Sequence, residues 1–134
     1  MEDCIFCKIS KGEIPSYKVY EDDNFLAFLD INPFVVGHTL VIPKKHFKWV
    51  WDLDGKDYLE LMEKVRMVAI ALRKTFNTEF VSQGIIGVDI SHAHIHLMPR
   101  EIGDYAGFFP DQKLDPKPTA EEFKKVAEAI KNKI

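Results

Sequence analysis

A chain of 134 residues, 46% of them hydrophobic, can bury one core of useful size, so we expect a single domain over residues 1–134. Lys and Arg total 18 against 21 Asp and Glu, and this net charge of −3 argues against an extended nucleic-acid surface, which would need excess basic side chains. With no basic and apolar leader at its start, no apolar run long enough for a bilayer and only two cysteines, we expect a cytoplasmic protein without a membrane partner.

The first half of the chain predicts three short strands. Runs rich in apolar residues over 19–21, 25–29 and 38–42 are separated by turn residues at 22–24 and by Asp, Asn and Pro at 30–33. The first two runs are close enough to pair as a hairpin. The third, with its β-branched and aliphatic side chains, suits a central position in a sheet.

One long helix is predicted next, from an N-cap at about Asp54 to about Phe76, because apolar residues recur along one helical face. A strand over 79–83, a loop over 84–91 and a strand over 92–98 follow, and we expect the two strands to pair antiparallel. Residues 101–118, which carry three prolines, predict an ordered surface segment. A last helix begins at Thr119, where Thr119 and Glu122 form a capping box. The order predicts an α+β domain, with an antiparallel sheet of about five strands packed against one long helix and a C-terminal helix.

The most informative functional motif is a row of three histidines, His92, His94 and His96, with small or apolar residues between them. In a strand all three would lie on one face and the residues between them on the other, whereas a helix would turn His94 away. We therefore predict a row of imidazoles facing a cleft. The row could bind a metal ion, or His94 could attack an electrophile while its neighbours handle protons. Spacing alone leaves both functions open.

Cys4 and Cys7 form a C-x-x-C pair near the start of the chain. A thioredoxin-like redox pair would follow a strand, and no strand is predicted before residue 4. Half of a tetrahedral zinc site is more plausible, since Zn²⁺ takes Cys and His ligands. The alternative is two free, partly buried thiols.

The heptad HAHIHLM at residues 92–98 resembles the signature of the histidine triad family of nucleotide hydrolases and transferases. Residues 4–9, 22–33 and 37–46 resemble further segments of that family. Together these segments span roughly residues 4–100, which we interpret as the core of the domain. Residues 101–134 resemble the family only loosely and are interpreted as a C-terminal extension.

The resemblance implies that the protein cleaves at the α-phosphate of nucleoside phosphoramidates or dinucleoside polyphosphates. His94 would form a covalent nucleotidyl-histidine intermediate that water resolves, while His96 and His38 would bind phosphate oxygens or the leaving group. The implied partner is a purine nucleotide. The substrate-binding residues that it implies are Asp30 at the ribose hydroxyls, Phe28, Leu29 and Ile31 around the base, and Ser82, Gly87 and Asp89 near the phosphate.

The same resemblance implies a structural zinc and a homodimer. Cys4, Cys7, His46 and His92 would hold the metal, which the chemistry would not require. The dimer would be built across the long helices and a strand edge.

The chain also departs from the family pattern before the triad. Many members carry Gly-Gln in this loop where this chain has Gly87 and Val88, and Val88 cannot donate a hydrogen bond. Asp89 would bring a negative charge near the phosphate. Arg100 and Lys44 are attractive phosphate partners by charge, but we interpret both as solvated residues. Three other functions remain open, namely a metal-dependent hydrolase, a nucleotidyl transferase and a non-enzymatic nucleotide-binding or interaction protein.

Overall fold

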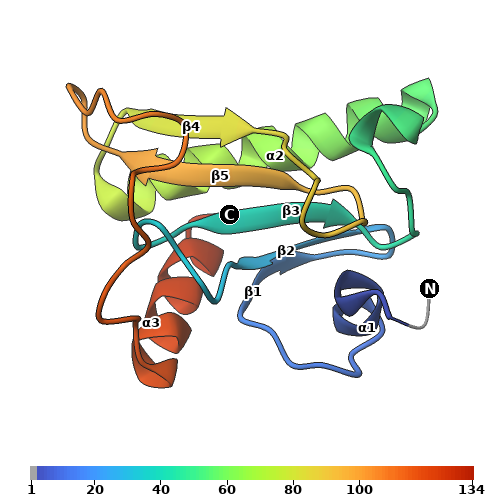
Figure 1. Ribbon diagram of the computed structural model, residues 1–134, viewed down its shortest axis with the longest axis horizontal. Coiled ribbons are helices and arrows are strands. Elements are labelled where there is room, and N and C mark those ends of the chain that lie inside the picture. The colour runs from blue at the N-terminus through green and yellow to red at the C-terminus, as the bar shows by residue number, and fades with distance from the viewer. Residues whose placement is uncertain (1–2) are drawn as a thin grey trace.

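The computed structural model describes residues 3–134, and Met1 and Glu2 lie outside the described residues. Its elements are α1 (Ile5–Ser10), β1 (Lys18–Glu21), β2 (Phe25–Leu29), β3 (Thr39–Pro43), the short 3-10 helix η1 (Val50–Asp52), α2 (Gly55–Phe76), β4 (Phe80–Gly84), β5 (Ile95–Arg100) and α3 (Ala120–Lys131). The strands form one antiparallel five-stranded sheet in the order β1-β2-β3-β5-β4 (Figure 1). The predicted α+β architecture is confirmed.

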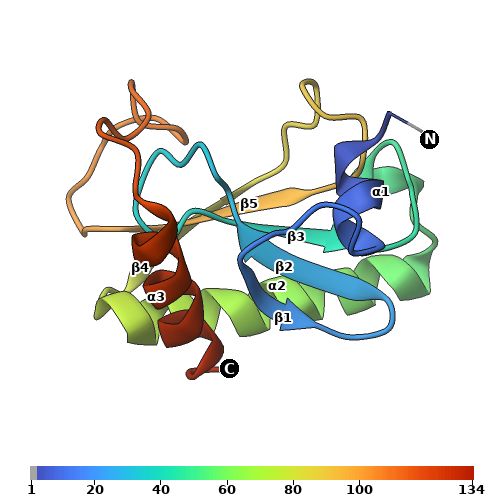
Figure 2. The ribbon, with the colours of Figure 1, turned by 90° about the horizontal axis from the view of Figure 1, so that it is seen from below.

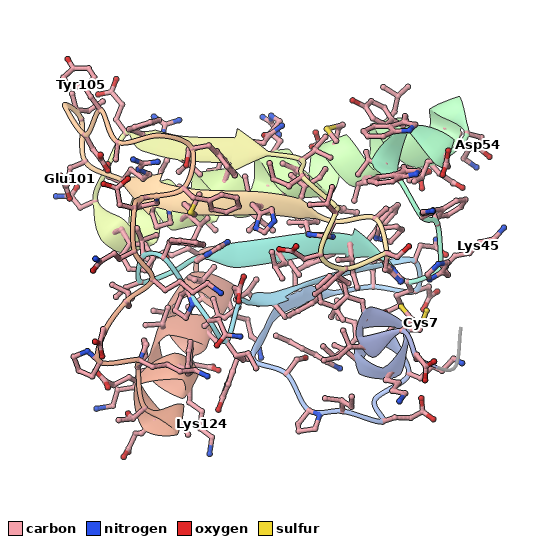
Figure 3. The ribbon with its side chains drawn as sticks, viewed as in Figure 1. Cys7, Lys45, Asp54, Glu101, Tyr105 and Lys124 are labelled. Carbon is pink, nitrogen blue, oxygen red and sulfur yellow. The ribbon has the colours of Figure 1, made fainter. Side chains whose placement is uncertain are left out.

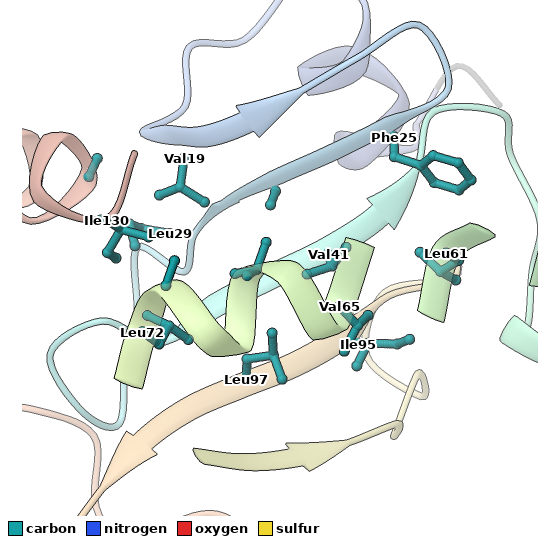
Figure 4. Close-up of a cluster of buried hydrophobic side chains, with 14 of the residues drawn as sticks. Val19, Phe25, Leu29, Val41, Leu61, Val65, Leu72, Ile95, Leu97 and Ile130 are labelled. Carbon is teal, nitrogen blue, oxygen red and sulfur yellow. The ribbon is translucent and has the colours of Figure 1, made fainter. Parts of the chain in front are cut away.

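The two faces of the sheet are covered differently. α2 and α3 pack against one face, and α1 and the long loops lie over the other (Figure 2). Every residue of β2, β3 and β5 is buried, as expected for central strands that are covered on both faces. The main core lies between the sheet and α2, where Val41, Ile95 and Leu97 meet Leu61, Val65 and Leu72 (Figure 4).

The two longer helices begin where the sequence predicts. The Asp54 side chain accepts a hydrogen bond from the Asp57 backbone N–H at 2.8 Å and caps α2. At α3 the Thr119 hydroxyl accepts from the Glu122 N–H at 3.1 Å, and the Glu122 carboxylate accepts from the Thr119 N–H at 2.9 Å. The predicted capping box is therefore confirmed.

The start of one strand was predicted wrongly, and the two short helices α1 and η1 were not predicted. β5 begins at Ile95 rather than at His92, because the backbone N–H of Ala93 donates to the carbonyl of Phe47 at 2.7 Å instead of joining the ladder. The predicted alternation of side chains between the two faces of the sheet nonetheless holds, since Ala93, Ile95 and Leu97 all lie in the main core. α1 begins directly after Cys4, whose Sγ accepts from the Cys7 N–H at 3.3 Å.

The interpretation of Arg100 as a solvated residue is wrong. Its side chain is 2% exposed, and its guanidinium donates to the Asp104 carboxylate at 2.7 Å. It also donates to the backbone carbonyls of Ala106, Gly107 and Phe108 at 2.8–3.2 Å. Arg100 is buried because the chain that follows β5 curls around it, so this residue organises the start of the segment 101–118.

Lys44 is paired rather than simply solvated, because its Nζ lies 2.7 Å from a carboxylate oxygen of Glu21.

None of the helices in the described part of the chain combines the length and the apolarity that a bilayer crossing requires.

Candidate active site and metal centre

A pocket of about 380 Å³ opens on the sheet face opposite α2 and α3. It brings together six of the predicted site residues, from β3, β5 and the loops at their ends. These are Asp30, His38, Gly87, Asp89, His94 and His96. Its other walls are Phe6, Asn32, Phe34, Leu40, Ile86, Ile90, Phe109 and Lys113.

The orientation of His94 follows from one backbone contact. Its Nδ1 lies 2.8 Å from the carbonyl oxygen of His92, and a carbonyl can only accept, so Nδ1 carries the proton. The lone pair of a neutral His94 is then on Nε2, which has no hydrogen-bond partner among residues 3–134. The ring is 5% exposed and packs edge-on against Phe6, with ring centroids 5.3 Å apart. The geometry therefore leaves Nε2 of His94 as the ring nitrogen available to a ligand in this pocket.

His38 and His96 are linked in a directed chain of hydrogen bonds. The backbone N–H of Phe34 donates to Nδ1 of His38 at 3.3 Å, so His38 carries its proton on Nε2. That Nε2–H faces Nδ1 of His96 at 2.9 Å, which leaves His96 with its proton on its own Nε2. His96 can therefore act as a hydrogen-bond donor toward a ligand.

Burial keeps this pair of rings neutral. It lowers the pKa of His38 to about 4, although the charge of Asp30 opposes the shift. Burial likewise lowers the pKa of His96 to about 3, and the neighbouring His38 and His94 add to the effect. At neutral pH both residues are thus dipolar donors and acceptors rather than cations.

Asp30 lies beside this histidine pair, at the end of β2. One carboxylate oxygen accepts from the Asn32 backbone N–H at 2.8 Å, and the other is 3.6 Å from Nε2 of His38. The first contact fixes the turn that follows β2. The second oxygen faces the pocket and can accept from a ligand hydroxyl.

Four predicted substrate-binding residues do not line this pocket. Phe28 packs against Phe6 below it, with ring centroids 5.4 Å apart. Leu29 belongs to the main core on the opposite face of the sheet, and Ile31 is 49% exposed on the surface. Ser82 lies on β4, where its hydroxyl is 3.5 Å from the carbonyl of Met98.

Two walls of the pocket were missed by sequence reasoning. Phe6 comes from the short helix α1, and Phe109 and Lys113 come from the segment 101–118. The aromatic residues of that segment are the only sequence signal that could have pointed to a site role. Nothing in their spacing shows which face of the sheet the segment covers.

The predicted zinc ligands converge next to the pocket. Figure 3 shows one of them, Cys7, on α1, on the side of the molecule where β3 ends. The ligand atoms of Cys4, Cys7, His46 and His92 all lie within 4.8 Å of one another. Sγ of Cys4 is 3.4 Å and Sγ of Cys7 3.5 Å from Nδ1 of His92, and Sγ of Cys7 is 3.3 Å from Nδ1 of His46. Tetrahedral zinc places its sulfur and nitrogen ligands about 3.3–3.8 Å apart, so the spacing fits.

The protonation pattern of this group also fits a metal. Nε2 of His92 donates to the carbonyl of Pro43 at 2.7 Å, so the lone pair on Nδ1 points at the two sulfurs. Burial and the neighbouring Cys4 raise the pKa of the Cys7 thiol to about 11. A zinc ion would displace that thiol proton and fill all four positions with protein ligands. Such a metal would be structural.

A second group, Asp30, His38 and His96, also has ligand atoms within 4.8 Å of one another. The positions of its ring protons disfavour metal binding. The Nε2 of His38 that would have to bind the ion carries the proton donated to His96. Reversing that tautomer would turn a ring N–H against the N–H of Phe34. The imidazole pair therefore suits hydrogen bonding better than coordination.

Comparisons with known proteins agree with this geometry. The HIT domain family model matches residues 11–103. The chain is 40% identical over 141 aligned positions to an uncharacterized HIT-like protein of Borreliella burgdorferi, covering 100% of both chains. It is 36% identical to adenosine 5'-monophosphoramidase hnt1 of Schizosaccharomyces pombe, covering 98% of each. A zinc-bound histidine triad family protein of Mycobacterium smegmatis superposes with a TM-score of 0.81 at 30% identity, covering 98% of this chain and 93% of that one. The chain belongs to the HIT domain family, the histidine triad family that its motifs resemble.

Proposed function

We propose that this protein is a nucleotide hydrolase that cleaves at the α-phosphate of nucleoside phosphoramidates or dinucleoside polyphosphates through a nucleotidyl-histidine intermediate. The observation that carries the proposal is the hydrogen bond from Nδ1–H of His94 to the His92 carbonyl. It leaves the lone pair of Nε2 facing a pocket in which the neutral His96 can donate a hydrogen bond to a ligand. The relative named as an adenosine 5'-monophosphoramidase supports the nucleotide substrate.

In the first step, the Nε2 lone pair of His94 attacks the α-phosphorus in line with the leaving group. A bond from Nε2 to phosphorus forms, and the bond from phosphorus to the leaving group breaks. His96 Nε2–H stabilises the charge on the phosphoryl oxygens or gives its proton to a leaving amine. His38 holds the tautomer of His96 through their 2.9 Å contact.

In the second step, water attacks the nucleotidyl-imidazole. A new oxygen–phosphorus bond forms and the bond to Nε2 breaks. The proton lost by the water returns to His96 where His96 has protonated a leaving amine, and otherwise passes to solvent. The nucleoside monophosphate then leaves with His94 restored. Splitting one displacement into two lowers each barrier, because neutral imidazole is both a good nucleophile and a competent leaving group near pH 7.

The nucleoside would be held beside this reaction centre. Asp30 is proposed to accept from the two ribose hydroxyls, since its second carboxylate oxygen faces the pocket. Phe6 and Ile90 offer an apolar wall for a purine. Gly87 and Asp89 line the same pocket and are proposed to lie near the phosphate.

The cysteine and histidine group is proposed to hold one structural zinc, which ties α1 to the segment before β5. A bound zinc ion would neutralise the negative charge of the two thiolates and would fix the position of His92. His92 would then position His94 through its carbonyl. The relative named as zinc-bound supports this assignment.

We also propose that residues 1–134 form one domain and that the protein is a cytoplasmic homodimer. β4 is the outer strand at one edge of the sheet, so its outer backbone groups are available for a second copy. Leu59 on α2 is 69% exposed, which would be explained by a helix contact between copies. Sedimentation of the purified protein tests the dimer.

The test of the mechanism is His94→Gly, assayed with adenosine 5'-phosphoramidate. Removing the nucleophile should lower kcat by at least about a thousandfold and leave nucleotide binding within about threefold, because little of the pocket is lost. Intact-protein mass spectrometry of wild type during turnover should detect a nucleotidyl adduct that His94→Gly lacks. If His94→Gly keeps most of its activity, the covalent mechanism is wrong. Wild type that binds nucleotide but turns over neither nucleoside phosphoramidates nor dinucleoside polyphosphates would favour the non-enzymatic alternative.

A further inference from the structure

The chain that follows β5 returns over the active site. The family model ends at residue 103, yet Phe109 and Lys113 both line the pocket. The Phe109 ring is 5.1 Å from the His96 ring and 4.8 Å from the Phe34 ring, measured between centroids. The backbone N–H of Leu114 donates to the carbonyl of Pro33 at 2.9 Å and holds the segment against the loop before β3. The extension is therefore part of the site.

The charges around the pocket are unevenly distributed. Among the described residues that line it, Lys113 is the one lysine or arginine, while Asp30 and Asp89 are both acidic. His38 and His96 are neutral at pH 7 because burial lowers the pKa of each. A polyanionic substrate thus meets a single full positive charge in this pocket, and that charge comes from the extension.

The aromatic rings show where Lys113 lies relative to the nucleophile. The rings of His94, His96 and Phe109 follow one another with centroid separations of 5.0 and 5.1 Å. The Nζ of Lys113 lies 5.6 Å from the ring centroid of Phe34, which is itself packed on Phe109. An in-line attack by His94 sends the leaving group away from that residue. A leaving group that passes His96 reaches the surface formed by Phe34, Phe109 and Lys113.

We propose that Lys113 determines leaving-group specificity by binding leaving groups that carry negative charge, such as the distal phosphates of a dinucleoside polyphosphate. The inference rests on the proposed hydrolase function and assigns a subsite to it. In the step concerned, the bond from phosphorus to the bridging oxygen breaks and its electron pair stays on that oxygen. The ammonium group of Lys113 stabilises the departing polyphosphate without transferring a proton.

An amine leaving group has a different requirement. Its nitrogen must gain a proton as the phosphorus–nitrogen bond breaks, and His96 Nε2–H can supply it. No negative charge builds up on that leaving group, so Lys113 has little to stabilise. The two substrate classes should therefore depend on two different residues.

The test compares Lys113→Ala with wild type on diadenosine tetraphosphate and on adenosine 5'-phosphoramidate. We expect kcat/KM to fall by about tenfold for the tetraphosphate and by less than about twofold for the phosphoramidate. Lys113→Arg should retain most of the tetraphosphate activity. Lys133→Ala, which removes an exposed lysine near the end of α3, is the matched control for net charge and should change neither value. Because Lys113 is exposed, the variants should fold like wild type.

The outcomes separate this inference from the function on which it rests. Equal losses on both substrates would show that Lys113 binds the nucleotide rather than the leaving group, and no loss on either would show that it binds neither. Each result overturns the proposal while wild-type turnover keeps the hydrolase function intact. Absence of wild-type turnover on both substrates would instead refute the hydrolase function itself.

Discussion

The Nε2 atom of His38 lies 2.9 Å from Nδ1 of His96, and both rings are buried between the sheet and the segment that follows β5. Their pKa values of about 4 and about 3 lie below the 6.5 expected of free histidine, with burial as the main cause in each case. Both rings are therefore neutral in the folded protein, whereas in the unfolded chain they would protonate as the pH falls below about 6.5.

This difference predicts how stability depends on pH. Between about pH 6.5 and pH 4 the unfolded chain binds protons that the folded protein does not, so the free energy of unfolding should decrease as the pH falls through this window. Above about pH 7 the two histidines are neutral in both states, so their contribution to the free energy of unfolding is fully present. Urea unfolding of zinc-free protein across this range measures it without interference from metal release. His96→Asn removes one group of this buried pair and should make the dependence of the unfolding free energy on pH shallower; an unchanged slope would contradict the prediction.

Zinc removal should affect stability before chemistry. We expect about one zinc per chain in protein purified without chelators, and Cys7→Ser should lose the metal and lower Tm by about 5–10 °C. The phosphoramidate activity measured well below Tm should persist, because the ion would have no open position for substrate. Ser10→Ala is a suitable control, since it changes a nearby residue without touching the ligands. A metal-free wild-type preparation would disprove the zinc assignment.

Asp89 should weaken binding of a phosphate substrate. It lines the same pocket as His94 and His96, and it also borders the surface beside Cys4 and His46. Asp89→Asn should raise kcat/KM for adenosine 5'-phosphoramidate by about threefold at low ionic strength, with less gain at high salt, where the repulsion is screened. Asp23→Asn is the control, because it makes the same charge change in the turn between β1 and β2, at a residue that does not line the pocket. If wild type and Asp89→Asn have the same kcat/KM at low salt, Asp89 faces away from the substrate.

Arg100 should be essential for the shape of the extension. Its guanidinium donates to the Asp104 carboxylate and to the carbonyls of Ala106, Gly107 and Phe108 at once, which is one acceptor more than the three N–H groups of a lysine ammonium can serve. Arg100→Lys should lower the free energy of unfolding by about 2 kcal/mol, because several hydrogen bonds of the buried guanidinium are lost. Chemical denaturation measures the change, with the exposed Arg66→Lys as control. A stability equal to that of the Arg66→Lys variant would mean that the segment holds its own shape.

The elements with strong local signals could be predicted. Asp54 and Thr119 mark helix starts because their side chains cap the first free N–H groups, and such capping depends only on nearby residues. The strands followed from alternating or continuous apolar runs bounded by turns. The histidine row was assigned to the right face even though His92 and His94 precede β5, because the alternation survives in the extended segment before it.

Other features depend on contacts between distant segments. α1 has only six residues and is held by Phe6 and Ile9 packing into a core formed by β2 and β3, so its local pattern was too weak to predict it. The burial of Arg100 depends on backbone carbonyls that curl back toward it. Phe109 and Lys113 reach the pocket only because of that curl. These residues could be found only once the tertiary structure was known.

β5 carries His96 in the middle of the sheet, hydrogen-bonded to β3 on one side and to β4 on the other. The backbone amides on such a strand exchange with solvent only when the sheet itself separates, which costs close to the full free energy of unfolding. His96 therefore has very little freedom to adjust to a ligand on the timescale of turnover. We therefore expect conformational adaptation to ligands of different size to come from the loop 85–91 and from the extension, while the residue that we propose as the donor to the phosphate keeps its position.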